Sequence, residues 1–172
     1  MFKALWLNIS LILISFVTFA QVEKEIDPPF NIKTITFVQN NQNSIPLFSL
    51  NDPFEIQFDD LYANEANYYY EIVHCNYDWK HSDLSKNEYL QGFDGIRIQE
   101  YTNSLNALQL YSHYKIGFPN KNTQLLVSGN YMIKILNERI TLESNKFLLV
   151  ICGKFVDSSY KSQILNLIDD KN

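Results

Sequence analysis

Three histidines, two cysteines and several carboxylates are the side chains that could ligate a metal ion or transfer a proton. His74 and Cys75 are adjacent, and a β-strand would direct their side chains to opposite faces, so one metal ion could not bind both. The sequence contains no CxxC, HxH or HExxH motif. We therefore expect no metal site and no cofactor. We interpret His74 as a hydrogen-bonded histidine at the edge of a hydrophobic core.

The carboxylates do not form a recognisable reaction centre either. Asp59 and Asp60 end a predicted strand, where a turn explains them, and Asp78 and Asp83 lie in a predicted loop, where they can bind backbone amides. The chain has no DxDxDG calcium loop, no nucleophile elbow, no glycine-rich phosphate loop and no cysteine-nucleophile signature. The sequence thus predicts a protein that is not an enzyme. Only a pocket joining a histidine to a carboxylate would change that prediction.

Short β-strands are the elements that must position these side chains. Phe54, Ile56 and Phe58 alternate with polar residues, which is typical of a half-buried strand. Turn-forming residues separate further segments of this kind, so that strands are predicted at residues 32–38, 45–50, 54–59, 68–75, 95–102, 111–118, 129–136 and 145–152. The predicted fold class is all-β, an immunoglobulin-like antiparallel β-sandwich of about seven or eight strands.

A long polar loop with aromatic residues follows the strand predicted at residues 68–75. Within it, Ser85 and Glu88 have the spacing of a capping box, so we expect a short helical turn. Tyrosine and tryptophan often serve as anchors at protein interfaces, and this loop is long enough to present them. We predict a partner-binding loop formed by Trp79, Asp83, Tyr89 and Phe93.

The aromatic strand itself has two apolar faces. Tyr70 and Ile72 are expected to point into the core, on the side opposite Glu71. Val73 and Cys75 then share the face of Glu71, which is too apolar to be plainly exposed to solvent. We expect the long loop or a partner to cover that face.

The two ends of the chain differ from the predicted sandwich. Lys3 and the apolar stretch up to Ala20 are typical of a secretory signal peptide at residues 1–20, cleaved before Gln21. Its apolar part, roughly 16 residues, is shorter than a membrane-spanning helix requires, so no transmembrane segment is expected after cleavage. An extended lead-in at residues 21–31 precedes the sandwich at 32–152. Residues 153–172 form a C-terminal tail whose apolar spacing favours a short helix.

Charge and cysteine content narrow the choice of partners. The net charge is −5 and the pI is near 5.1, which argues against nucleic acid as a partner. Export would permit a disulfide between Cys75 and Cys152, each in a predicted strand. Two reduced thiols are the other interpretation, and the sequence leaves both open because it does not set the separation of the Cα atoms.

Several ordered motifs resemble the N-terminal domain of the type IX secretion system plug protein. The resemblance covers about residues 32–150. The motifs are His74-Cys75 at the end of the aromatic strand, Trp79, Ser82-Asp83-Leu84, residues 88–93, residues 111–114 and Phe118-Pro119-Asn120.

This resemblance implies an exported, periplasmic and non-enzymatic accessory of a protein-secretion machine, associated with the inner side of the outer membrane. Its partner would be the translocon β-barrel of the outer membrane, whose periplasmic opening it would close when the translocon is idle. Members of the family continue beyond the sandwich, so residues 153–172 are either a native tail or the remnant of a truncation.

A secreted carbohydrate-binding or adhesive β-sandwich is the alternative function. Aromatic strands and asparagine-rich loops would suit sugar stacking and hydrogen bonding about as well as they suit a protein partner. Binding to a glycan panel would favour this alternative, and co-purification with an outer-membrane barrel would favour the secretion role.

Overall fold

Alternation of apolar and polar side chains builds the sandwich strand by strand. Along β4 (Phe54–Asp60), the buried side chains of Phe54, Ile56 and Phe58 alternate with more exposed ones, as the sequence predicts. The computed structural model describes residues 27–50, 52–137 and 149–156, with the side chains of the last segment described from residue 153. The predicted signal peptide, most of the lead-in and most of the C-terminal tail lie outside these residues.

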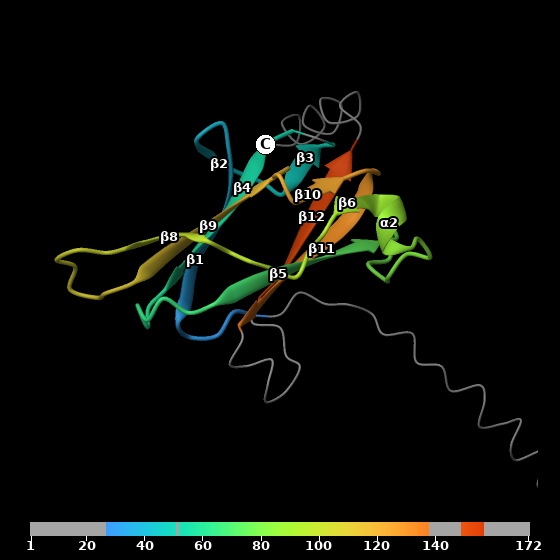
Figure 1. Cartoon of the computed structure of the whole chain (residues 1–172). Coiled ribbons are helices and arrows are strands. Elements are labelled where there is room, and N and C mark those ends of the chain that lie inside the picture. Colours follow the sequence, from blue (N-terminus) through green and yellow to red (C-terminus); the bar gives the residue numbers. More distant parts are fainter. Residues whose placement is uncertain (1–26, 51, 138–148, 157–172) are drawn as a thin grey trace, which may run out of the picture.

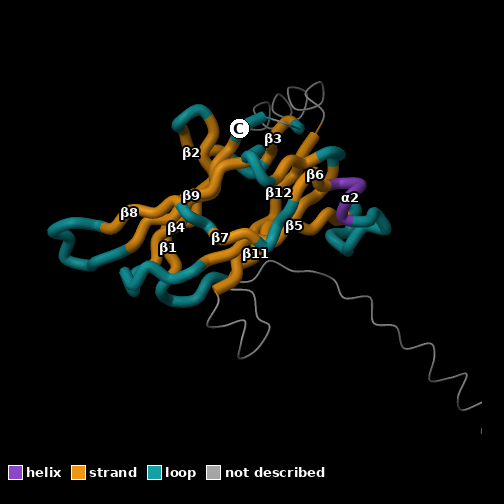
Figure 2. The backbone as a smooth tube through the Cα atoms, in the orientation of Figure 1, coloured by secondary structure: helices purple, strands orange, loops and turns teal. Residues whose placement is uncertain are grey.

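Two five-stranded sheets face each other (Figures 1 and 2). The first sheet has the order β2-β1-β4-β9-β8, and all its neighbouring strands are antiparallel. Its strands are β1 (Ile32–Gln39), β2 (Gln42–Ser44), β4, β8 (Glu100–Asn103) and β9 (Ser112–Phe118).

The second sheet has the order β3-β12-β11-β5-β7. Its strands are β3 (Leu47–Ser49), β5 (Tyr68–Cys75), β7 (Ile96–Arg97), β11 (Gly129–Asn137) and β12 (Leu149–Val156). A separate two-stranded sheet pairs β6 (Leu90–Gly92) with β10 (Thr123–Leu125). The predicted all-β sandwich is confirmed. It differs from the prediction in that β3 pairs with β12 in parallel and in that several strands too short to predict from alternation are added.

The turn between β1 and β2 follows directly from its asparagines. Gln39 pairs with Gln42, so that Asn40 and Asn41 form a two-residue hairpin loop. Their φ angles are 53° and 61°, the left-handed values that a type I′ turn requires and that asparagine tolerates.

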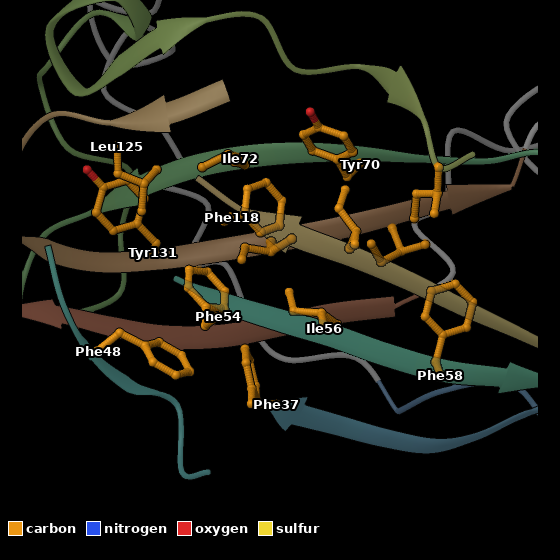
Figure 3. Packing of buried hydrophobic residues seen from close by; sticks show 14 of the residues in the cluster. Phe37, Phe48, Phe54, Ile56, Phe58, Tyr70, Ile72, Phe118, Leu125 and Tyr131 are labelled. Carbon is orange, nitrogen blue, oxygen red and sulfur yellow. The ribbon is translucent and has the colours of Figure 1, made fainter. Parts of the chain in front are cut away.

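An aromatic core fills the space between the two sheets (Figure 3). Phe54 of the first sheet stacks on Phe48 of the second, with ring centroids 4.3 Å apart. Tyr68 of the second sheet meets Tyr114 of the first edge-to-face at 4.8 Å. Aromatic pairs in these geometries add to the free energy gained by burying their area. The core therefore holds the sheets face to face and makes the sandwich a rigid frame for its loops.

The segment predicted as one strand at residues 95–102 is two strands in different sheets. β7 pairs with β5 of the second sheet, whereas β8 pairs with β9 of the first. Ile98, between them, is buried, and its amide donates a hydrogen bond to the carbonyl of Tyr68. The chain crosses here from one sheet to the other, a change that alternation cannot reveal because the inward-facing side chains enter the same core.

The strand order also bears on the predicted disulfide. Cys75 pairs with Asn130 of β11, and Cys152 pairs with Met132 on the opposite side of the same strand. With one strand between them and a two-residue offset along that strand, the two Cα atoms lie more than about 10 Å apart by ordinary strand spacing, beyond the roughly 7 Å limit of a disulfide. Of the two interpretations left open by the sequence, this register favours separate thiols.

The end of β12 and the length of the helices bear on the predicted tail and on membrane insertion. β12 runs to Val156, so the first residues of the predicted tail belong to the second sheet. Among the residues that the structure describes, no helix is long and apolar enough to cross a membrane.

Candidate functional site

The predicted partner-binding loop begins with a tight turn that follows β5. The side-chain oxygen of Asn76 accepts hydrogen bonds from the amides of Asp78 and Lys80, at 2.9 and 3.1 Å. Trp79 adopts a left-handed φ of 61° within this turn, and its amide donates to the carbonyl of Asn76. The turn directs the chain back over the sheet, and the Asn130 side chain ties it to β11 through the Asn76 carbonyl at 2.8 Å.

Trp79 covers the apolar outer face of β5. Its side chain is half-buried and packs against a small cluster of Val73, Cys75 and Met132. The expectation that the loop covers the face shared by Val73 and Cys75 is therefore confirmed. Trp79 acts mainly as a structural anchor, because the indole surface that contacts this cluster is not available to a partner.

His74 holds the middle of the loop from the other face of β5. Its Nδ1 lies 2.7 Å from the Ser82 hydroxyl, and its Nε2 lies 3.4 Å from the Ser128 carbonyl oxygen. The ring lies against those of Tyr89 and Tyr131, with centroids 5.6 and 4.9 Å away. The predicted role of His74, a hydrogen-bonded histidine at the core edge, is confirmed.

The loop contains a single helical turn, α2 (Lys86–Tyr89). The Glu88 carboxylate accepts hydrogen bonds from the amide and the hydroxyl of Ser85, both at 2.7 Å, which confirms the predicted capping box. These hydrogen bonds hold the pKa of Glu88 below its usual value. The same residues therefore fix where the loop turns towards β6.

An ion pair fixes the helical turn to the sheet. The Lys86 ammonium lies 2.8 Å from the Asp94 carboxylate, which also accepts a hydrogen bond from the Ile72 amide at 2.8 Å. Burial disfavours the charged form of Lys86, but the hydrogen bonds and charge of Asp94 outweigh it, so its pKa is raised. The Asp94 carboxylate thus accepts the hydrogen bond from a β5 backbone amide that a neighbouring strand would otherwise accept.

The four predicted binding residues fall into two groups. Tyr89 is only 6% exposed and packs in the main core, where it anchors α2. The prediction that Tyr89 is an exposed binding residue is therefore wrong. Burial also raises the pKa of Tyr89. Asp83 is exposed, and the Phe93 side chain is 75% exposed. Sequence reasoning did not single out Tyr77, which is 85% exposed in the same loop.

One histidine does meet a carboxylate. His113 Nδ1 lies 2.6 Å from an Asp59 carboxylate oxygen, and the two residues are direct cross-strand partners on β9 and β4. Two open cavities of about 270 and 300 Å³ in the described part of the chain are lined by neither residue. The contact between these two side chains joins two adjacent strands, as cross-strand side-chain pairs commonly do.

A buried carboxylate braces the far end of the sandwich. Asp60 is fully buried and accepts hydrogen bonds from the Asn31 amide, the Tyr68 hydroxyl and the Tyr62 backbone amide, at 2.8, 2.9 and 3.0 Å. Burial and the nearby Asp60 raise the pKa of Tyr68, and burial is the main cause that raises the pKa of Tyr114 to about 12.

Within the described residues, no group of three or more His, Cys, Asp or Glu side chains could hold a metal ion.

Comparison with known proteins places this arrangement in a family. The family model described as "Type 9 secretion system plug protein 1st domain" matches residues 32–151. A crystal structure of a hypothetical protein from Parabacteroides merdae is 34% identical in sequence, with a TM-score of 0.72. The match covers 80% of this chain and 35% of that one, so the chain spans about a third of the length of this relative. No curated protein matches the chain.

The family match spans both sheets from the first residue of β1 into β12, and it includes the loop anchored by Trp79 and Tyr89. The resemblance noted in the sequence motifs is thereby confirmed. The chain belongs to the type 9 secretion system plug protein family and carries its first domain.

Proposed function

We propose that this protein is a non-enzymatic, periplasmic accessory of a type IX secretion machine that binds the periplasmic opening of the outer-membrane translocon barrel and closes it when idle. The observation that carries this proposal is the match of residues 32–151 to the first domain of a secretion-system plug protein. The sequence pattern of a signal peptide at residues 1–20 supports export to the periplasm. The same match favours the secretion role over the carbohydrate-binding or adhesive alternative.

Closure by this protein would be steric. A sandwich whose two sheets are joined by interlocking aromatic side chains deforms little, because protein cores pack as densely as organic crystals. Such a body can obstruct an opening without any chemical step. Secretion requires the opening to be cleared again, so binding must be reversible. The protein must therefore dissociate fast enough for secretion to proceed, which sets an upper limit on its affinity for the barrel.

The partner-binding loop at residues 77–93 supplies one contact surface. Its backbone is held by the Asn76 turn, the capping box and the ion pair to Asp94, while Tyr77, Asp83 and Phe93 remain exposed. A loop fixed before binding loses less conformational entropy when it meets a partner. We assign contact with the translocon to these exposed side chains, with Trp79 and Tyr89 as the anchors that position them.

Affinity capture tests this proposal. The tagged, exported chain is purified from solubilised cell envelopes, and the proteins that accompany it are identified by mass spectrometry. The proposal predicts recovery of the very large translocon barrel. Capture of no barrel by a chain that is shown to be folded would contradict it, and binding to a glycan panel in the same state would support the alternative.

A Tyr77→Ser, Phe93→Ser double variant then tests the loop surface. Both side chains are exposed, so the variant is expected to remain folded and to capture less barrel. Equal capture by this variant would reject the loop as a contact while leaving the proposed function in place.

A further inference from the structure

The first sheet has a notch at the point where β8 begins. Glu100, the first residue of β8, pairs with Lys115 of β9, and the residues before Glu100 cross to the second sheet (Figure 2). The open cavity of about 270 Å³ lies in the fork between these two segments. Its walls are residues 96–100 of the crossing segment, residues 115–117 of β9 and residues 120–122, together with Tyr70. We call this cavity the β8–β9 notch.

Three cations line the β8–β9 notch. They are Arg97, Lys115 and Lys121, and Glu100 is the one carboxylate among the described residues of its walls. None of the three cations forms an ion pair with another described residue. Charges of one sign gathered in a cleft focus the electrostatic potential and raise the local concentration of the opposite ion. The notch therefore favours an anionic group, although the chain as a whole carries a net charge of −5.

A hydrogen-bonded turn fixes one wall of the notch. The Asn120 side chain donates to the Gly117 carbonyl at 3.0 Å and accepts a hydrogen bond from the Asn122 amide at 2.9 Å. The backbones of Asn120 and Thr123 exchange two further hydrogen bonds, at 3.0 and 3.2 Å. Lys121 thus belongs to a turn that is formed before any ligand binds, so this wall loses little conformational entropy on binding.

Gly117 indicates how a ligand passes the notch. It lies inside β9, and its φ is outside the left-handed region. The atoms nearest to a Cβ at this position would be Glu55 Cγ at 3.8 Å and the Phe54 carbonyl oxygen at 3.9 Å, which are ordinary contacts. Neither the backbone conformation nor the packing therefore requires glycine here. A glycine inside a strand weakens it and often marks a place where a ligand or another backbone approaches closely.

The second open cavity, of about 300 Å³, meets the notch at Gly117. Gly117 lines both cavities, and Pro53 and Pro119 are among the other residues of the second. Val38, Glu55 and Gly117 are successive cross-strand neighbours on β1, β4 and β9. The two cavities thus adjoin over a position that has no side chain, which suits an elongated ligand. Its anionic group belongs in the notch, because the charged residue of the second cavity is Glu55.

We propose that the β8–β9 notch binds an extended acidic peptide segment of a partner protein. A carboxylate of that segment pairs with Arg97, Lys115 and Lys121, which offer charge-assisted hydrogen bonds, and its main chain passes over Gly117 into the second cavity. An extended peptide supplies both a carboxylate and a main chain that is narrow enough for this passage. A single small anion would fill only the notch and would give no role to the open position at Gly117. Such a site is additional to the proposed contact with the translocon and does not depend on it.

An NMR titration of the isotope-labelled full exported chain tests the inference. The added ligand is a synthetic peptide with blocked ends in which aspartate alternates with threonine, and its matched control carries asparagine in place of aspartate. The aspartate peptide is expected to shift the backbone amide signals of Gly117 and Lys121, and to bind less tightly as the salt concentration rises. The asparagine peptide is expected to leave these signals unchanged.

Two variants and a matched control locate the site. Arg97→Gln, Lys121→Gln removes two exposed cations of the notch and should raise the dissociation constant about tenfold or more, because one charge-assisted hydrogen bond alone is worth about a decade in affinity. The control, Lys33→Gln, Lys154→Gln, makes the same change in net charge with exposed lysines outside the notch and should bind like wild type. Gly117→Val should remain folded and lose binding, because its side chain would stand where the two cavities meet.

Several results would overturn the proposed site. Equal binding of the two peptides would exclude a carboxylate as the recognised group, and an unchanged dissociation constant for Arg97→Gln, Lys121→Gln would exclude the notch. Full binding by a folded Gly117→Val chain would exclude a main chain that passes over this residue. Inorganic phosphate that bound the same residues as tightly as the aspartate peptide would make the notch a simple anion site and contradict an extended ligand. Each of these results leaves the proposed function standing, since capture of the translocon barrel tests that function separately.

Discussion

Two aromatic residues four positions apart, Tyr89 and Phe93, should respond oppositely to truncation. Both belong to the proposed partner-binding loop, yet Tyr89 is 6% exposed and Phe93 is 75% exposed. The Tyr89 ring lies 5.6 Å from that of His74 and 6.1 Å from that of Tyr131, and its hydroxyl donates to the Ile72 carbonyl at 3.3 Å. Truncation of Tyr89 therefore removes a core side chain, whereas truncation of Phe93 removes surface.

The expected magnitudes follow from that burial. Tyr89→Ala should lower the free energy of unfolding by about 3 to 5 kcal/mol, the range for removing a large aromatic side chain from a core. The hydrogen bond to Ile72 is long, so Tyr89→Phe should cost about 1 kcal/mol or less. Phe93→Ala should stay within about 0.5 kcal/mol of wild type, as exposed substitutions usually do.

Urea unfolding of the mature chain, followed by circular dichroism, measures these differences. A lower midpoint with an unchanged dependence on urea would show that stability alone has changed. Comparable losses for Tyr89→Ala and Phe93→Ala would refute the division of the loop into anchors and exposed contacts. Capture of the translocon barrel by Phe93→Ala can then be interpreted without a correction for unfolding.

Three further changes probe the β-sandwich that carries the proposed partner-binding loop. Asp60→Ala should cost about 2 to 4 kcal/mol in urea unfolding, because the buried Tyr68 hydroxyl loses its acceptor. Gly129→Ala should cost about 2 kcal/mol or more in the same assay, since the new Cβ would lie 2.3 Å from His74 Nε2 and φ is +155°. The contribution of Tyr68 and Tyr114 to stability should be constant up to about pH 10, and above it should fall by about 1.4 kcal/mol per pH unit for each residue until its raised folded-state pKa is reached, about 12 for Tyr114.

The sign of the alkaline effect follows from linkage. A tyrosine whose pKa is raised in the folded protein keeps its proton after the unfolded chain has lost it, so stability is lost as pH rises from the unfolded pKa, near 10, to the folded value. Titration of Tyr114 near pH 10 in the folded protein would contradict its burial as the cause. An unfolding midpoint equal to wild type for Asp60→Ala would contradict the buried hydrogen bond from Tyr68. The same result for Gly129→Ala would contradict the close approach of residue 129 to His74.

Much of the local structure could be predicted from side-chain pattern and turn chemistry. β5 begins and ends where the aromatic alternation indicates, and the pair Asn40-Asn41 forms the left-handed turn that asparagine favours. The capping box of Ser85 and Glu88 forms because it needs only neighbours in sequence. Each of these signals is local, so the rest of the fold cannot obscure it.

The parts that were missed depend on contacts between distant segments. Alternation states which face of a strand is buried, but not which strand lies beside it, so the crossing at Ile98 and the parallel pairing of β3 were not predicted. Tyr89 and Phe93 look alike in sequence, and only the position of α2 against the core decides which is buried. The exposed leucines of residues 104–111 have the composition of a buried segment, so their exposure could not be inferred.

Channel conductance tests the central claim most directly. The purified translocon barrel is reconstituted in a planar lipid bilayer, and the full exported chain is added on the periplasmic side. The proposed function predicts that the ionic current through the open barrel falls as the chain is added and recovers when the chain is washed away. An unchanged current, with the chain folded and bound to the barrel, would contradict closure of the opening by this protein.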